Sequence, residues 1–165
     1  DARLKKKSVE VEGITDALIE LAEDMMETMY NAPGIGLAAP QIGILQRVIV
    51  MDCAKKEDEE PDPIIMVNPL IKASSEEKNV YEEGCLSIPE HFAEVTRPEL
   101  VQVEWIDLEG KQHSEEFNGL KSTCVQHEID HLNGKLFIDY LGPIKRQMIT
   151  RKMQKFKREK LRGSE

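Results

Sequence analysis

Near the start of the chain, apolar residues recur at the spacing of one helical face. Over residues 14–30 they fall at intervals of three and four, the period of an amphipathic α-helix. Thr15 or Asp16 can cap the start of this helix, and Pro33 cannot continue its hydrogen bonds. We therefore predict an N-terminal helix that packs through its Leu and Met positions.

The middle of the chain has the pattern of strands. Residues 46–52 and 64–71 are β-branched, apolar runs of strand length, separated by an acidic stretch that reads as a solvated loop. Between residues 78 and 117, short alternating runs such as 100–106 are punctuated by turns, which predicts antiparallel strands. Helical patterns return at residues 122–132 and 144–161. Strands in the middle with helices on either side indicate an α+β fold.

Length and composition favour one domain over residues 1–165. A chain of 165 residues with 40% hydrophobic content can bury one sizeable core. It contains no apolar run long enough to span a membrane, so no membrane partner is expected. The basic start lacks the apolar stretch of a secretory signal, and three cysteines at uneven spacing do not suggest a disulfide framework. These features predict a cytoplasmic protein.

A histidine pair gives the strongest chemical signal. His127, Glu128 and His131 form the pattern HExxH, and four residues along a helix return to the same face. Both imidazoles could therefore bind one metal ion, with the carboxyl of Glu128 beside it. The alternative is a helix whose histidines are merely exposed.

A catalytic metal site usually has three protein ligands, so a further ligand is needed. Cys85 is the best candidate, although a single cysteine is often only a small buried apolar residue. Cys124 could in principle add a fourth ligand and close a structural site. It precedes His131 by seven residues, a rise of about 10.5 Å along a helix, so we interpret Cys124 as a packing residue.

The segment from Gly34 to Gln41 is rich in glycine and alanine. Such a backbone can approach a ligand closely and pair edge-on with an extended peptide, although an ordinary turn is the simpler reading. The amide of Gln41 could donate a hydrogen bond to an oxyanion.

Three segments, GIGLAAPQ, EEGCLS and QHEIDHL, occur in this order and resemble the signature motifs of the peptide deformylase family. The resemblance implies antiparallel strands surrounding a central helix that carries HExxH, with an N-terminal and a C-terminal helix. It also implies that the enzyme removes the N-formyl group from the formyl-methionine of newly made polypeptides. Glu128 would be the general acid/base acting on metal-activated water.

The resemblance further implies the roles of individual residues. The metal ligands would be Cys85, His127 and His131, and the oxyanion would be stabilised by Gln41 and the backbone N–H of Leu86. The remaining candidates bind substrate: Ile35, Gly36 and Gly84 along the peptide backbone, and Leu120 and Cys124 near the methionine pocket. The cofactor would be one divalent metal ion, Fe²⁺ by resemblance, while Zn²⁺, Ni²⁺ and Co²⁺ also suit the ligand types. Phe92 stands where some relatives have a substrate-contacting arginine, so that contact is not expected.

Two other functions share the HExxH pattern. A zinc peptidase would cleave unformylated peptides and would normally recruit a His or Glu as the third ligand. A non-catalytic, metal-stabilised binding module would need four protein ligands and no Glu128 or Gln41.

Charge is concentrated at the C-terminal end. Residues 144–165 contain nine Lys and Arg against two Glu, whereas the whole chain has a net charge of −9. A basic helix of this kind either packs through apolar residues such as Met148 or binds a polyanion. Family resemblance favours docking on ribosomal RNA near the exit of the ribosomal tunnel, and DNA is not an expected partner.

Overall fold

The computed structural model describes residues 4, 6–32, 34–54, 60–85, 88–136, 139 and 147–155, with the backbone alone for 84, 85 and 88–93. Its elements follow in the order α1 (Asp16–Asn31), β1 (Gly36–Ala38), the short 3₁₀ turn η2 (Ala39–Ile42), β2 (Val48–Asp52), β3 (Pro63–Ser74), β4 (Lys78–Cys85), β5 (Ile88–Pro98), β6 (Leu100–Ile106), β7 (Gln112–Asn118) and α2 (Gly119–Leu132). Residues 147–155 form a further helical segment, called the C-terminal helix below.

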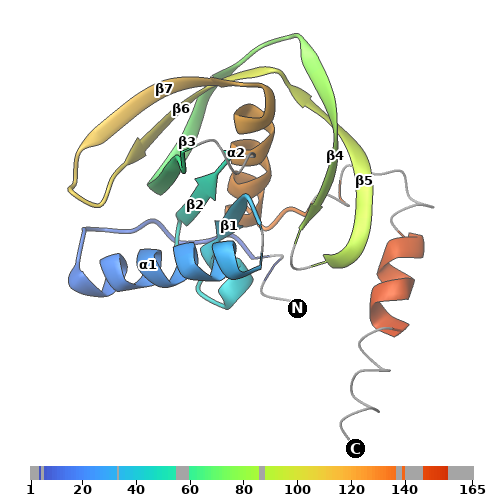
Figure 1. Cartoon of the computed structure of the whole chain (residues 1–165), viewed down its shortest axis with the longest axis horizontal. Coiled ribbons are helices and arrows are strands. Elements are labelled where there is room, and N and C mark those ends of the chain that lie inside the picture. The colour runs from blue at the N-terminus through green and yellow to red at the C-terminus, as the bar shows by residue number, and fades with distance from the viewer. Residues whose placement is uncertain are drawn as a thin grey trace, which may run out of the picture.

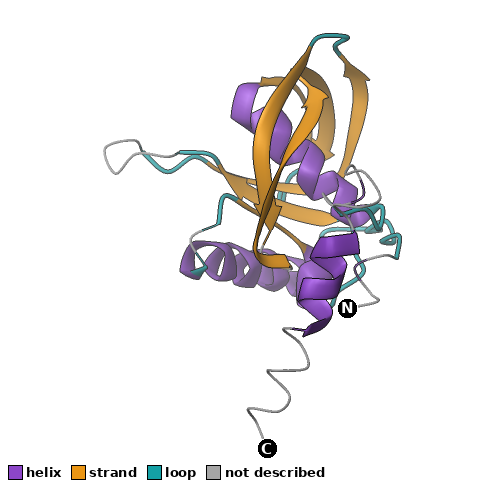
Figure 2. Ribbon diagram, turned by 90° about the vertical axis from the view of Figure 1, so that its right-hand side faces the viewer, coloured by secondary structure: helices purple, strands orange, loops and turns teal. Residues whose placement is uncertain are grey.

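The strands form two antiparallel sheets that surround α2. Five strands pair in the order β1-β2-β3-β6-β7, and β4 and β5 form a separate hairpin. In Figure 1 these strands curve around α2, which stands in the centre of the molecule. Figure 2 shows the same strands in side view, with α1 and the C-terminal helix below them. The α+β prediction and the central position of the HExxH helix are confirmed.

Residues 48–51 of β2 are all apolar because both faces of the strand are covered. Successive side chains of a strand point to opposite faces, and here every residue of β2 is buried. Ile49 belongs to the cluster that packs against α2, whereas Val48 and Val50 belong to the cluster that includes residues of α1. The continuous apolar run therefore reflects a strand between two helices.

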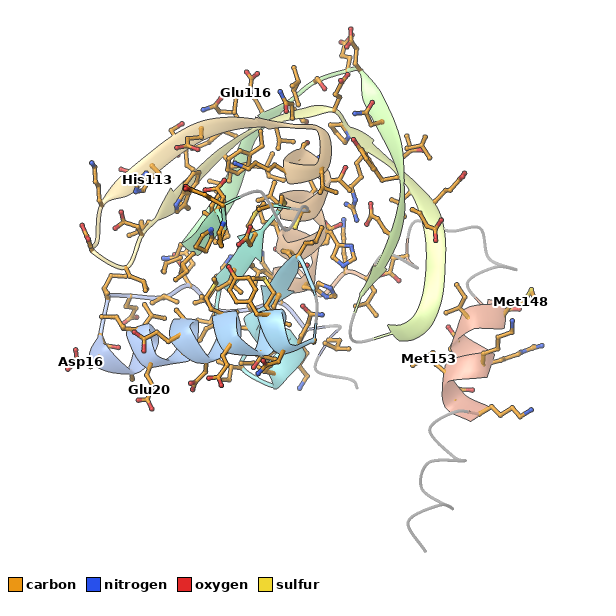
Figure 3. The ribbon with its side chains drawn as sticks, viewed as in Figure 1. Asp16, Glu20, His113, Glu116, Met148 and Met153 are labelled. Carbon is orange, nitrogen blue, oxygen red and sulfur yellow. The ribbon has the colours of Figure 1, made fainter. Side chains whose placement is uncertain are left out.

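Helix α1 lies against the sheet through the predicted Leu and Met positions. Leu18, Met25 and Met29 are buried against it, and Thr15 caps the helix by accepting a hydrogen bond from the N–H of Leu18. Asp16 and Glu20 project away from the body in Figure 3.

Two details of the sequence prediction differ from the structure. Helix α2 begins at Gly119, three residues before the predicted start. The chain passes from the extended Asn118 into this helix through Gly119, whose φ of 55° glycine adopts more readily than other residues. In the C-terminal helix, Met148 was expected to pack against the body, but its side chain is 53% exposed. Ile149 is the apolar residue that is buried in the described part of this helix. Figure 3 shows Met148 and Met153 on opposite sides of this helix. The remainder of the predicted helix over 144–161 lies outside the described residues. In the described part of the chain, no helix has the length and apolar character needed to cross a membrane.

Candidate metal centre

Helix α2 brings His127, Glu128 and His131 into one buried cluster. Their candidate ligand atoms all lie within 4.8 Å of one another. The Nε2 atoms of the two histidines are 3.2 Å apart, and the rings meet edge to face. Two imidazoles that bind one tetrahedral zinc ion at about 2.0–2.1 Å have their nitrogens separated by about 3.3 Å. The observed spacing therefore matches a shared metal ion.

This cluster is buried because α2 is held in the core on its other side. Val125, Ile129 and Leu132 pack into the cluster between α2 and the five-stranded sheet. Since the helical repeat is 3.6 residues, this anchoring turns the histidine-bearing face toward β4 and β5. His127 and His131 are consequently about as buried as the surrounding apolar core.

Burial shifts the pKa values of two members of this cluster, Glu128 and His131. It raises the pKa of Glu128 to about 7, against the opposing effect of His127, so this carboxyl can take and release a proton near neutral pH. Burial, together with the neighbouring His127 and Arg97, lowers the pKa of His131 to about 3. His131 is therefore a neutral imidazole with a lone pair available for a metal.

The two Nε2 atoms are the candidate ligand atoms because their spacing fits one divalent metal ion, and other polar atoms of the cluster lack hydrogen-bond partners. In the described part of the chain, Oε2 of Glu128 and Nδ1 of His131 are buried without a hydrogen-bond partner. Oγ of Ser8 is in the same state, but at Glu128 and His131 two such atoms belong to one cluster, which is consistent with a catalytic role or a bound water or ion there. Cys85 ends β4, where its backbone pairs with Ile88. The side chain of Cys85 and all of Leu86 lie outside the described residues, so their predicted roles stay predictions.

A second group of charged residues surrounds His127 and was not identified from the sequence. Nδ1 of His127 lies 2.8 Å from Oε1 of Glu83. Arg97 donates two hydrogen bonds to Glu83, of 2.7 and 2.9 Å, and a third of 2.7 Å to Asp130. Burial opposes ionisation of Glu83, yet the hydrogen bonds from His127 and Arg97 keep its pKa below the usual value. Glu83 and Asp130 do lie inside the recognised motifs, whereas nothing local distinguishes Arg97.

Strand β1 passes directly beside Glu128. A Cβ atom built on Gly36 would lie 3.0 Å from Sγ of Cys124 and 3.0 Å from both Cγ and Oε1 of Glu128. Contacts of 3.0 Å are tighter than most Cβ atoms make, so a larger residue at this position would require the side chain of Cys124 or Glu128 to shift by a few tenths of an ångström. The carbonyl oxygen of Ile35 accepts from the N–H of Asp52 at 2.8 Å, and the thiol of Cys124 lies 3.7 Å from it.

The amide of Gln41 has a fixed orientation. Its Oε1 accepts a hydrogen bond from the N–H of Ala38 at 2.9 Å. The Nε2 end therefore carries the donors of this side chain. Gln41 thus follows β1 as a positioned hydrogen-bond donor, as its candidate role requires.

The structure brings some of the predicted substrate-binding residues together. Gly36 and Cys124 are in contact, and Leu120 lies one helical turn before Cys124 on α2. Cys124 is buried in the core cluster, which confirms that it packs. Gly84 belongs to β4. Its predicted contact with the peptide backbone stays a prediction.

Strands around a helix that presents two buried imidazoles and a neighbouring carboxyl define the class of metal-dependent hydrolases. Comparison with known proteins identifies the family within that class. The model of the polypeptide deformylase family matches residues 1–147. A peptide deformylase of Rhizobium meliloti is 54% identical over 155 residues, which cover 94% of this chain and 88% of the relative.

Solved structures agree with this assignment. The crystal structure of peptide deformylase from Ehrlichia chaffeensis has a TM-score of 0.91 and 38% identity, covering 98% of this chain and 94% of that one. The structure of a peptide deformylase from Legionella pneumophila has a TM-score of 0.88 and 46% identity over the same shares. The chain belongs to the polypeptide deformylase family.

Proposed function

We propose that the centre on α2 carries out the deformylation of N-formylated nascent peptides, with His127 and His131 as metal ligands and Glu128 as the general acid/base. As a member of its family, the chain is a peptide deformylase, a metal-dependent hydrolase of the formyl amide. The observation that carries the assignment of roles is the pair of buried Nε2 atoms, 3.2 Å apart, beside a buried carboxyl.

The proposed ligand set is Cys85, His127 and His131. A divalent metal bound there would act as a Lewis acid and lower the pKa of water. One thiolate with two imidazoles suits Fe²⁺, which we propose as the physiological ion, and equally accepts Zn²⁺, Ni²⁺ or Co²⁺. Substituting serine for Cys85 should weaken metal binding strongly, because a hydroxyl is a much poorer ligand than a thiolate.

Glu128 moves the proton. A pKa of about 7 allows its carboxylate to accept a proton from the attacking water and then to donate it to the leaving amine. Negative charge that develops on the formyl oxygen would meet the Nε2 donors of Gln41 and the backbone N–H of Leu86.

Strand β1 offers an edge for the peptide. It ends the five-stranded order, pairing with β2 alone among the strands the structure describes. An extended peptide could add to this edge near Ile35 and Gly36, with Gly84 on the opposite side. The methionine side chain would then lie toward Leu120 and Cys124, where its flexible thioether suits an apolar pocket.

A substrate comparison tests this function. Protein purified without oxygen should hold one metal ion per chain and release formate from a formyl-methionyl tripeptide. The same protein should leave the unformylated tripeptide intact, as should protein stripped of metal by a chelator. Cleavage of the peptide bond in the unformylated tripeptide would instead identify a peptidase.

We also propose that the enzyme works in the cytoplasm and binds the ribosome through its basic C-terminal end. Arg151, Lys152 and Lys155 are exposed on the C-terminal helix. Cationic side chains on a chain of net charge −9 would orient it toward the phosphates of ribosomal RNA. Reversing these three charges to Glu should weaken co-sedimentation with ribosomes in a salt-dependent way. The matched variant with both lysines replaced by arginine should bind normally. Equal binding of the Glu variant would refute the proposed docking.

A further inference from the structure

The charged groups behind His127 form one connected chain across three elements. Asp130 and His127 lie on α2, Glu83 on β4 and Arg97 on β5. The guanidinium of Arg97 contacts Oδ2 of Asp130 and both carboxylate oxygens of Glu83, and Oε1 of Glu83 also contacts the His127 ring. The side chains of Arg97 and Glu83 are only 3% and 5% exposed. Such burial is costly unless every charge is paired, as these are.

The geometry of this chain fixes which nitrogen of His127 can bind a metal. A carboxylate only accepts hydrogen bonds, so the 2.8 Å contact requires the proton of the neutral ring to be on Nδ1. The lone pair is then on Nε2, the atom that faces His131 at 3.2 Å. A carboxylate in this position also makes the imidazole a stronger donor to a metal.

Arg97 in turn fixes Glu83. Two parallel hydrogen bonds between a guanidinium and a carboxylate hold both groups in one plane, which a single contact would not do. Since Arg97 is itself held by Asp130, the orientation of Glu83 is tied to the same helix that carries both histidines. The β4–β5 hairpin thereby acts as a support behind the metal centre.

We propose that Glu83 is a positioning residue that sets the tautomer and orientation of His127 through a hydrogen bond, and that Arg97 holds Glu83 in place for this task. The proposal rests on the proposed ligation by His127 and His131. Glu83 and Arg97 contact no reacting atom, so their removal should act first on metal affinity. A purely structural ion pair would stabilise the fold and leave the metal affinity of the folded protein unchanged.

Three variants separate these roles. Glu83→Gln removes the charge that contacts His127. Asp130→Asn weakens a contact of Arg97 and leaves the contact between Glu83 and His127 intact. Asp107→Asn is the matched control, because Asp107 pairs with His113 at 2.6 Å beside β7, away from α2. The affinity of each folded variant for Zn²⁺ is measured by competition with a chelator, and the visible spectrum of each Co²⁺-loaded variant is recorded.

Glu83→Gln should weaken Zn²⁺ binding by about 10- to 100-fold and alter the Co²⁺ spectrum, the usual scale for losing the partner of a ligating histidine. Asp130→Asn should weaken Zn²⁺ binding by only a few-fold, and Asp107→Asn should bind Zn²⁺ as tightly as the wild type does. If Glu83→Gln does not fold, Arg97→Lys replaces it. Lysine keeps the charge but lacks the planar fork, so a comparable loss of affinity is expected.

Two results would overturn the proposal. One is wild-type Zn²⁺ affinity and an unchanged Co²⁺ spectrum in folded Glu83→Gln, or wild-type affinity in folded Arg97→Lys if that variant is used. The other is an equal loss in Glu83→Gln and Asp130→Asn, which would show a general effect of buried charge. Failure of the wild-type chain to bind one Zn²⁺ would instead refute the metal centre itself, so the two failures are distinguishable.

Discussion

Gly36 of β1 lies directly against the side chain of Glu128. A methyl group on Gly36 would approach Cγ and Oε1 of Glu128 to 3.0 Å, and Sγ of Cys124 to the same distance. Neither neighbour can easily move away, because both are buried side chains of α2. Strand β1 and the carboxyl proposed to transfer the proton therefore share one tightly packed contact, and the position of each depends on the other.

Substituting alanine for Gly36 should lower kcat/KM about tenfold or more, because a shift of Glu128 by a fraction of an ångström disturbs its alignment with substrate. The variant should retain its metal, since the three heavy atoms nearest to the added methyl group belong to Cys124 and Glu128 and not to either histidine. Gly13→Ala is the control, because a Cβ atom at Gly13 would have no neighbour within 4 Å. Equal rates for the two variants would show that the contact has no catalytic consequence.

Replacing Gln41 with leucine should slow turnover about a hundredfold, the usual cost of losing one oxyanion donor. KM should change much less than kcat, because the bond strengthens only as charge develops on the formyl oxygen. Gln102→Leu is a suitable control, since the amide of Gln102 pairs with Ser114 on the surface of the sheet. A variant at Gln41 with normal kcat would exclude it from the reaction.

The hydrogen bond from Tyr30 to Asp52 predicts a pH dependence of stability. Its O···O distance is 2.6 Å. Burial opposes ionisation of Asp52, but hydrogen bonds from Tyr30, Ala54 and Asp62 give it a net lowered pKa. Desolvation and the bond to Asp52 raise the pKa of Tyr30 to about 12.

The sign of each effect follows from these shifts. The depressed pKa of Asp52 gives stability that is present above its unfolded value of about 4 and is lost as pH falls below it. The raised pKa of Tyr30 gives stability that is present below about pH 10 and is lost as pH rises toward 12. Tyr30→Phe should therefore lower the free energy of unfolding by about 1 kcal/mol at pH 7, and by less at pH 3. Denaturant unfolding at both values measures the difference, and a pH-independent loss would contradict the proposed bond.

Periodicity predicted the elements that carry their own local signal. The spacing of Leu and Met fixed α1 to within two residues at its start, and the alternation over 100–106 coincided with β6. His127 and His131 could be assigned to one site because residues four positions apart lie on the same face of a helix, which is a property of the helix alone. Strand β1 was less evident, since three residues rich in small side chains carry no alternation.

The residues behind the histidines could not be found in this way. Glu83 and Arg97 are 14 residues apart and meet because β4 and β5 form a hairpin with a specific register. A shift of that register by one residue would turn either side chain to the opposite face. Their contact with α2 further depends on how the hairpin packs, so the relevant information is tertiary and absent from any local pattern.

The most direct test of the account is a comparison of Glu128→Gln with the wild type, both purified without oxygen. Glutamine has nearly the same shape, so the fold and both histidines should be preserved. Metal content and the rate of formate release from a formyl-methionyl tripeptide are measured on the same samples. We expect one metal ion per chain in both proteins and a rate about 10²- to 10⁴-fold lower in the variant, the range attributed to general acid–base catalysis. Loss of the metal together with the activity, or a rate equal to that of the wild type, would contradict the assignment of Glu128 as the group that moves the proton.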